Sequence, residues 1–136
     1  MSKVSVLIAV YNAERYLKEC LDSVCSQSLR DIQIICIDDC STDASAQILD
    51  SYAVNDARVK VIHLSENRGQ AFARNEGLKI ADGEYVMMLD SDDWLGQDAI
   101  EKAYRAIIAD EENDCCLFDL MLYYQDEERV EPYRNR

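Results

Sequence analysis

Short apolar runs alternate with segments of helical periodicity along most of the chain. Each run is too short for a helix and ends at polar residues, which indicates a strand. Because the runs are almost continuously apolar, without polar residues at every second position, they are typical of strands buried on both faces of a parallel sheet. The predicted strands cover Val4–Val10, Ile32–Ile37, Val59–Leu64 and Tyr85–Leu89.

Between these runs, apolar residues recur at intervals of three and four, the spacing of one face of a helix. The predicted helical stripes run over residues 16–25, 44–52, 70–81 and 100–108. Asn12 is placed to cap the first helix, and Ser41, Thr42 and Asp43 are start signals for the second. Strands that alternate with helices require crossover connections. We therefore predict an α/β fold with a mainly parallel sheet and helices on both faces.

The C-terminal part of the chain follows a different pattern. Cys115–Tyr124 is apolar enough for a fifth strand, and beyond it the charge density rises. We expect no further element there. The predicted organisation is one domain over residues 1–124 and a charged tail over residues 125–136. A length of 136 residues suits a single domain with a modest core.

The charge of the chain limits its partners. It has 14 Lys and Arg against 27 Asp and Glu, for a net charge of -13. Such a field repels nucleic acids and anionic membrane surfaces, and a phosphate-bearing ligand would need a cation between itself and the protein. No apolar stretch is long enough to span a bilayer, and we predict no signal peptide before the first strand.

The six cysteines form no C-x-x-C pair. Five of them lie in apolar-patterned segments: Cys20, Cys25, Cys36, Cys115 and Cys116. Buried, reduced thiols explain this pattern better than zinc ligands or disulfides do, and they suit a cytoplasmic protein. We therefore expect a cytoplasmic location.

Polar residues follow three of the predicted strands at their carboxyl ends, where open α/β sheets bind ligands. These sequences are Tyr11-Asn12, Asp38-Asp39 and Asp90-Ser91-Asp92-Asp93. A D-x-D match is common by chance in an acidic chain, and a solvated turn would explain it. Here the match directly follows a strand, and residues i and i+2 of an extended segment point the same way. Asp90 and Asp92 can therefore approach one ion, and their oxygens suit Mg²⁺ or Mn²⁺.

Two other nucleotide-binding classes are disfavoured by the turn after the first strand. The Asp38-Asp39 pair could cap the next helix or hold the ribose of a dinucleotide. A dinucleotide-binding fold needs a glycine-rich turn after the first strand, whereas this turn, residues 10–14, contains no glycine. A nucleotidyltransferase would normally carry a glycine-rich basic loop at the same place, and none is present.

Two arginines and the single histidine are further candidates. Arg68 and Arg74 flank the start of the third predicted helix, where each could contact a phosphate or form a surface ion pair. The two interpretations are equally favoured for either residue alone. His63 lies inside the third predicted strand, which favours a structural role.

Taken together, these motifs resemble those of the inverting glycosyltransferases of family 2, which share the GT-A fold. The matching stretches are residues 4–12, 37–43, 67–69, 73–77, 83–85 and 89–93. They occur in order and with family-like spacing up to about Leu95, and such a set is far more specific than D-x-D alone. The resemblance implies a Rossmann-like GT-A fold, of which this chain would be the nucleotide-diphospho-sugar-binding half.

The resemblance also implies roles for individual residues. Tyr11 would pack near the nucleotide base, and Asp39 would accept a hydrogen bond from it, which suits the N3–H of uracil. Arg74 would lie near the diphosphate. Asp90 would face the ribose or the metal, and Asp92 would ligate Mn²⁺ or Mg²⁺. The implied donor-binding residues are Val10, Tyr11, Asp39, Arg74, Asp90 and Ser91, and the implied metal ligands are Asp92 and Asp90.

The implied reaction is transfer of a sugar from a nucleotide-diphosphate donor, with a UDP-sugar expected. The acceptor would be a saccharide or a lipid-linked molecule, as in cell-wall or polysaccharide biosynthesis. The metal would neutralise the departing nucleoside diphosphate, and a carboxylate base would deprotonate the acceptor hydroxyl. In relatives that base lies well downstream of D-x-D.

We therefore expect the catalytic base and most of the acceptor site to lie outside this chain, which alone would be a poor catalyst. A nucleotide-sugar-binding module without turnover is the alternative. A missing partner layer would also expose apolar surface on the 100–108 helix or the 115–124 strand, and such surface favours self-association as a homodimer.

Overall fold

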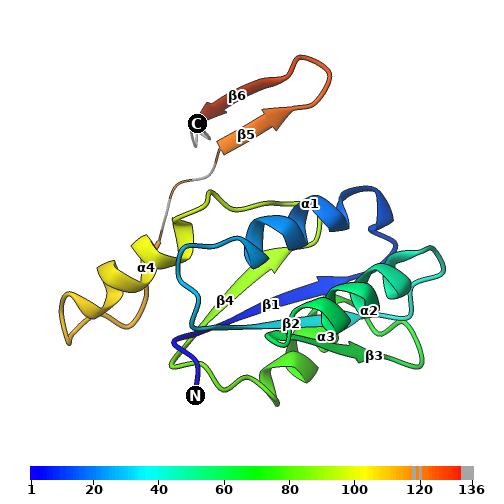
Figure 1. Ribbon diagram of the computed structural model, residues 1–136, viewed down its shortest axis with the longest axis horizontal. Coiled ribbons are helices and arrows are strands. Elements are labelled where there is room, and N and C mark those ends of the chain that lie inside the picture. The colour runs from blue at the N-terminus through cyan, green and yellow to red at the C-terminus, as the bar shows by residue number, and fades with distance from the viewer. Residues whose placement is uncertain (118, 120, 133–136) are drawn as a thin grey trace. The chain divides into compact units, whose positions relative to one another are not determined.

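The computed structural model describes residues 1–117, 119 and 121–132 (Figure 1). The chain divides into two compact units, Met1–Lys102 and Ala103–Arg136. The first unit holds the sheet predicted from the sequence. None of the described helices has the length and apolar character that crossing a membrane would require.

The first unit is built on a four-stranded sheet whose neighbouring strands all run parallel. The strands are β1 (Val4–Val10), β2 (Ile32–Asp38), β3 (Val59–His63) and β4 (Tyr85–Asp90). Their order across the sheet is β3-β2-β1-β4. The four strands predicted from the apolar runs are confirmed, with bounds that differ by at most one residue.

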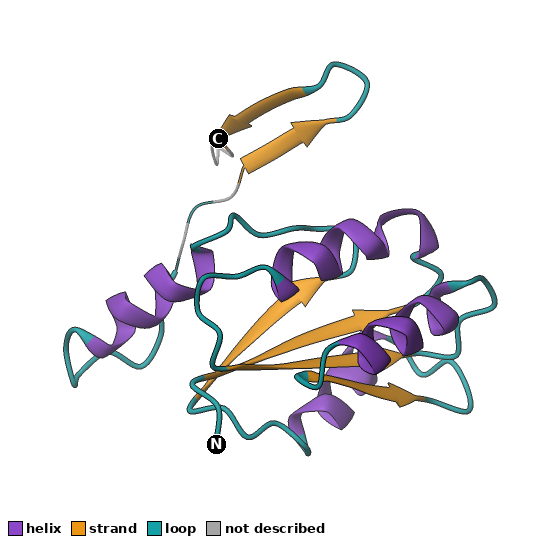
Figure 2. Ribbon diagram, viewed as in Figure 1, coloured by secondary structure: helices purple, strands orange, loops and turns teal. Residues whose placement is uncertain are grey.

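Three helices connect these strands and cover both faces of the sheet (Figure 1, Figure 2). They are α1 (Glu14–Cys25), α2 (Ser45–Asn55) and α3 (Gln70–Leu78), and α4 (Ala99–Ile108) follows β4. From β1 to β3 the chain moves in one direction across the sheet, and it then returns to place β4 beside β1. Because parallel crossovers are right-handed, α1 and α2 lie on one face and α3 on the other. The predicted fold class is therefore confirmed.

The central strands supply most of the core because both of their faces are covered. Every residue of β1 is buried, and β2 is buried except at Gln33. On the α3 face, Leu7 and Ile37 pack with Ala73 of the helix. The continuous apolar pattern of these strands therefore follows from their position between two helical layers.

The predicted cap of α1 by Asn12 is wrong. Ala13 occupies the N-cap position, and its side chain makes no capping bond. Asn12 adopts a left-handed backbone conformation, with φ 48°, and its Oδ1 accepts hydrogen bonds from the backbone N–H groups of Thr42, at 2.8 Å, and Asp43, at 3.3 Å. The left-handed turn directs this side chain to the β2–α2 loop. The N–H of Glu14, the first residue of α1, donates to Asp43 Oδ2 at 3.1 Å instead.

The second unit contains a hairpin of β5 (Met121–Tyr124) and β6 (Arg129–Pro132), which pair antiparallel. The predicted strand over 115–124 is thus confirmed only in its last four residues, and positions 118 and 120 lie outside the described residues. The expectation that no element follows residue 124 is wrong. Cys115 is exposed, contrary to the predicted burial.

Charged and polar side chains pair within this hairpin. Tyr124 donates a hydrogen bond to Glu131 across the hairpin at 3.0 Å, and Arg129 pairs with Glu127 at 2.9 Å and with Glu131 at 2.8 Å. The sequence predicted a charged tail over residues 125–136, whereas in the structure these charges of opposite sign pair with one another.

We expect Gly83→Ala to lower the free energy of unfolding by about 1–3 kcal/mol, as overpacking typically does. A methyl group there would overlap the backbone nitrogen of Ser5 and lie 2.8 Å from the Ser5 hydroxyl and the Tyr85 carbonyl. Gly96→Ala is the matched control, since its added methyl meets nothing within 4 Å. Urea unfolding of both variants measures the difference. Equal effects of the two substitutions would show that the close approach at Gly83 is unimportant.

Candidate functional site

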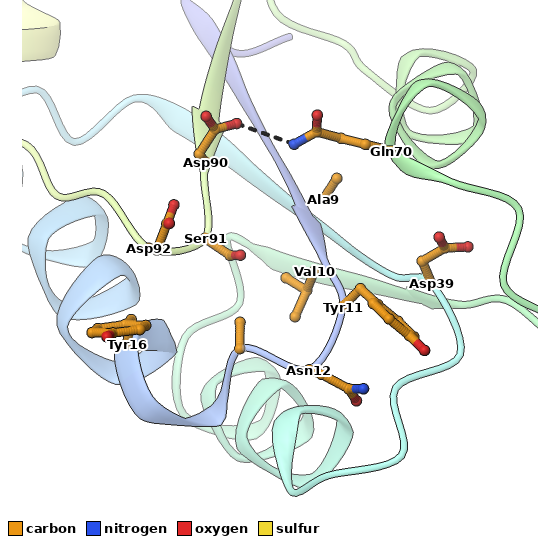
Figure 3. A pocket seen from close by; sticks show the side chains of 11 residues that line it. Ala9, Val10, Tyr11, Asn12, Tyr16, Asp39, Gln70, Asp90, Ser91 and Asp92 are labelled. Carbon is orange, nitrogen blue, oxygen red and sulfur yellow. Dashed lines mark hydrogen bonds between the residues drawn. The ribbon is translucent and has the colours of Figure 1, made fainter.

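A crevice with a volume of about 420 Å³ lies at the carboxyl ends of β1, β2 and β4 (Figure 3). Its lining residues are Ala9, Val10, Tyr11, Asn12, Ala13, Tyr16, Asp39, Gln70, Asp90, Ser91 and Asp92. The chain leaves β1 toward β2 on one side, whereas β4 adjoins β1 on the other. This is the topological switch point at which open α/β sheets bind ligands.

Most of the residues predicted to bind a donor or a metal meet in this crevice. The predicted residues that line it are Val10, Tyr11, Asp39, Asp90, Ser91 and Asp92. Parallel strands end at one edge of a sheet, so motifs far apart in the sequence come together there. Arg74 does not line the crevice. Tyr16 and Gln70 line the crevice, although they are not among the predicted site residues. The only sequence signal for them is that each lies near the start of a predicted helix that follows a strand.

Three carboxylates gather at the end of β4. Asp90, Asp92 and Asp93 each offer an oxygen, and these three atoms lie within 4.8 Å of one another. Partial burial and the charges of Asp92 and Asp90 raise the pKa of Asp93. Asp93 is not among the predicted ligands. It belongs to the cluster because the chain turns after Asp90, where the Asp93 N–H donates to the Asp90 carbonyl at 3.1 Å. The mutual repulsion within this cluster favours a bound cation.

Helix α3 neutralises part of this charge. The Arg74 guanidinium lies 2.6 Å from Asp90 Oδ1, and the Gln70 amide donates to the same oxygen at 3.2 Å. Within the described structure, Arg74 Nε is buried without a hydrogen-bond partner. Asp90 is therefore held toward α3, and of the three carboxylates it is the one with a cationic partner in the structure.

Asp39 links the crevice to the loop before α3. Its side chain is buried, Oδ1 accepts the N–H of Arg68 and Oδ2 accepts the N–H of Gly69, both at 2.8 Å. Gly69 has φ 90°, a conformation that side chains disfavour, so glycine suits the position. Each carboxylate oxygen can accept more than one hydrogen bond. Asp39 can therefore hold this loop and still accept a hydrogen bond from a ligand.

The side chains of Tyr11 and Arg68 differ in their relation to the crevice: Tyr11 lines it and Arg68 does not. Tyr11 is half-exposed at the crevice, and its ring extends from the end of β1 beside Asp39 (Figure 3). The Arg68 guanidinium pairs with Glu66 at 3.3 Å and stacks over Phe72, 4.1 Å from the ring centroid. For Arg68 the sequence left open a phosphate contact and a surface ion pair, and the structure shows the ion pair.

His63 joins the ends of β2 and β3 to α2, in agreement with the predicted structural role. Its Nδ1 lies 3.0 Å from Asp38 Oδ2, and its Nε2 lies 2.8 Å from Asp50 Oδ1. Hydrogen bonds to Asp38 and Asp50 raise the pKa of His63. Burial favours a higher pKa for Asp38, but hydrogen bonds from Ser41 and His63 outweigh it and lower that pKa. His63 thus bridges the carboxylates of Asp38 and Asp50.

We expect the stability contributed by His63 to depend on pH. The raised pKa of His63 means that its contribution is fully present below its ordinary pKa of 6.5 and is lost as the pH rises through the folded value. At acid pH, protonation of Asp38 again removes the stability that the His63–Asp38 pair contributes. His63→Gln should therefore lower the free energy of unfolding at pH 6, by about 1 kcal/mol or less because the pair is partly solvated, and by less at pH 9. Urea unfolding at both values measures this, and a pH-independent difference would contradict it.

Comparison with known proteins identifies what this arrangement resembles. A family model described as "Glycosyl transferase family 2" matches residues 5–135. The putative glycosyltransferase EpsH of Bacillus subtilis is 42% identical over 123 residues, covering 90% of this chain and 35% of EpsH.

Two solved structures share the fold. Staphylococcus aureus TarS 1–349 in complex with UDP-GlcNAc matches with a TM-score of 0.72 and 36% identity, over 79% of this chain and 31% of that one. The mannosyltransferase PcManGT of Pyrobaculum calidifontis, in complex with GDP-Man and Mn²⁺, matches with a TM-score of 0.73 and 27% identity, over 80% and 33%. The chain thus spans about a third of EpsH, of the TarS 1–349 fragment and of the PcManGT chain, and 21% of TarS as a whole.

Proposed function

The chain belongs to glycosyl transferase family 2, and on that premise we propose that its crevice binds a nucleotide-sugar donor, with UDP as the nucleoside diphosphate. The observation that supports this most directly is the meeting of Tyr11, Asp39 and the acidic cluster at one switch point. An aromatic ring, a hydrogen-bond acceptor and a cation site are the groups that a base and a diphosphate require. The proposal concerns the donor side of the reaction.

Tyr11 and Asp39 would receive the base. The half-exposed Tyr11 ring offers a flat apolar face, and the neighbouring Asp39 carboxylate is an acceptor without a proton to donate. Uracil presents one N–H on its pairing edge, which a carboxylate can accept. Because Asp39 is already fixed by two backbone N–H groups, it would be rigid before a ligand arrives.

Asp92, Asp93 and Asp90 would hold a divalent cation. Three carboxylate oxygens within 4.8 Å fit Mn²⁺ or Mg²⁺, which prefer hard oxygen ligands. When bound, such an ion would neutralise the charge that develops on a departing nucleoside diphosphate. In this role Asp90 contributes less than Asp92, because Asp90 Oδ1 is already engaged by Arg74 and Gln70.

Transfer of the sugar to an acceptor is the reaction we propose for the whole protein, because the relatives are named glycosyltransferases. The acceptor we propose is a saccharide or a lipid-linked molecule; for comparison, the name of the relative TarS gives a polymer of a sugar-alcohol phosphate, poly(ribitol-phosphate). A binding module without turnover is the competing proposal. Release of UDP from a UDP-sugar in the presence of an acceptor distinguishes the two, since only an enzyme releases it.

The donor proposal is tested by titrating the 136-residue chain with UDP in a calorimeter, once with Mn²⁺ and once with EDTA. We expect binding with Mn²⁺ and an affinity at least about tenfold lower with EDTA, a difference of about 1.4 kcal/mol. GDP should bind more weakly than UDP. Equal affinities with and without EDTA would contradict the metal site, and tighter binding of GDP would assign a guanine nucleotide to the same crevice.

A further inference from the structure

Three polar residues of helix α1 and the turn after it contact the chain that follows β4. They are Cys20 and Ser23, which lie about one helical turn apart in α1, and Gln27, two residues beyond the end of the helix. The segment they meet, residues 91–98, joins β4 to α4 and is here called the acidic loop because it carries Asp92 and Asp93. Most of its side chains are exposed, so apolar burial contributes little to fixing its position.

Cys20 and Ser23 bind backbone groups on either side of Asp92 and Asp93. The Cys20 thiol donates to the Asp90 carbonyl at 3.6 Å. Burial, followed by the charges of Asp93, Asp92 and Asp90, raises the pKa of this thiol to about 12, so it keeps its proton and remains a donor. The Ser23 hydroxyl accepts the N–H of Leu95 at 3.1 Å.

Gln27 holds the other end of the loop. Its side chain is fully buried, which is uncommon for a glutamine. The amide nitrogen donates to the carbonyls of Ser23, at 3.0 Å, and Gly96, at 2.6 Å. The amide oxygen accepts the N–H of Ile100 at 3.0 Å. One buried side chain therefore binds backbone groups on both sides of Gln97. Replacing it would remove the acceptor of the Ile100 N–H and one of the two donors to the Gly96 carbonyl, which also accepts the N–H of Ala99.

We propose that Ser23 and Gln27 are positioning residues that hold the backbone of the acidic loop, and so keep Asp92 and Asp93 beside Asp90. The carboxylates repel one another, and the backbone anchors oppose that repulsion in the metal-free chain. The inference deepens the proposed function and rests on it for the identity of the bound cation. The anchoring itself concerns the metal-free chain and can be measured there.

Ser23→Ala removes the acceptor for Leu95, and Gln27→Met removes every hydrogen bond of the buried amide while keeping its approximate shape. Ser51→Ala is the matched control: the Ser51 hydroxyl donates to a carbonyl three residues earlier in α2, as that of Ser23 does in α1, and it has no recorded bond to the acidic loop. Amide hydrogen exchange is followed in the metal-free 136-residue chain, at Asp93 in the loop and at Leu7 in β1. Mn²⁺ affinity is then measured by calorimetry under conditions where all variants are folded.

We expect Asp93 to exchange about tenfold faster in Ser23→Ala, the factor that corresponds to one lost hydrogen bond, while Leu7 is unchanged. Mn²⁺ affinity should fall by a similar factor, and Ser51→Ala should change neither. If Gln27→Met does not fold, Ser23→Ala alone decides. The positioning role would be overturned by any of three results in Ser23→Ala. These are unchanged exchange at Asp93, equal acceleration of exchange at Asp93 and Leu7, or an unchanged Mn²⁺ affinity in a variant whose free energy of unfolding is lower. If the unsubstituted chain binds no Mn²⁺, the proposed cation site fails, and exchange at Asp93 still decides whether Ser23 and Gln27 anchor the loop.

Discussion

Replacing Asp92 with Asn should weaken Mn²⁺-dependent binding of UDP by at least about tenfold, since even the loss of an outer-shell partner typically costs a metal site 10–100-fold. Asp92 lines the crevice and belongs to the cluster of three carboxylates within 4.8 Å. The substitution keeps the size of the side chain and removes one negative charge. Calorimetric titration with UDP, in Mn²⁺ and in EDTA, measures the effect, which should be confined to the experiment with metal.

Two controls separate metal binding from a general change of charge. Asp98→Asn removes a negative charge from the same loop, but Asp98 pairs with Lys102 at 2.7 Å and is not part of the cluster, so UDP binding should be unchanged. Asp90→Asn should have a smaller effect than Asp92→Asn, because Arg74 already neutralises Asp90. In the absence of metal, Asp92→Asn should not lower the unfolding temperature, since it relieves repulsion. Equal losses for Asp92 and Asp98 would contradict the assigned cation site.

Replacing Asp39 with Ala should have two effects of comparable size. The N–H groups of Arg68 and Gly69 lose their acceptor, which should lower the free energy of unfolding by about 1–3 kcal/mol. If the carboxylate also accepts the N–H of uracil, UDP binding should weaken by about 1.5–3 kcal/mol, the range for a hydrogen bond to a charged group. The preference for UDP over GDP should narrow at the same time.

Inorganic pyrophosphate separates these two roles of Asp39 because it has no base. With Mn²⁺ present, its affinity should be the same for the Asp39→Ala variant and the unsubstituted chain, while that of UDP falls. Equal losses for both ligands would mean that Asp39 acts only by holding the loop before α3. An unchanged UDP affinity would leave Asp39 the purely structural role of joining β2 to that loop.

The order of the elements, the parallel sheet and the polar strand ends could all be predicted from the chain itself. Strands such as Val4–Val10 are continuously apolar because two helical layers cover them, and this signal is local and strong. Asp90 and Asp92 could be grouped with Asp39 before the structure because strand ends of one parallel sheet share an edge. The resemblance to family 2 glycosyltransferases rests on these same residues.

Tertiary structure decided the features that depend on where a side chain is directed after the backbone turns. The sequence predicts Asn12 as a helix cap, but its left-handed backbone conformation directs the side chain to the β2–α2 loop. Asp93 joins the carboxylate cluster only because the chain turns after Asp90. The charged end of the chain forms β6, which pairs with β5. Gln27 carries no signal in the sequence, since its partners are backbone groups about seventy residues away. The spacing of apolar residues in a segment indicates which of its faces is buried, and this can be predicted from that segment alone. The contacts above join segments far apart in the sequence, so only the folded structure reveals them.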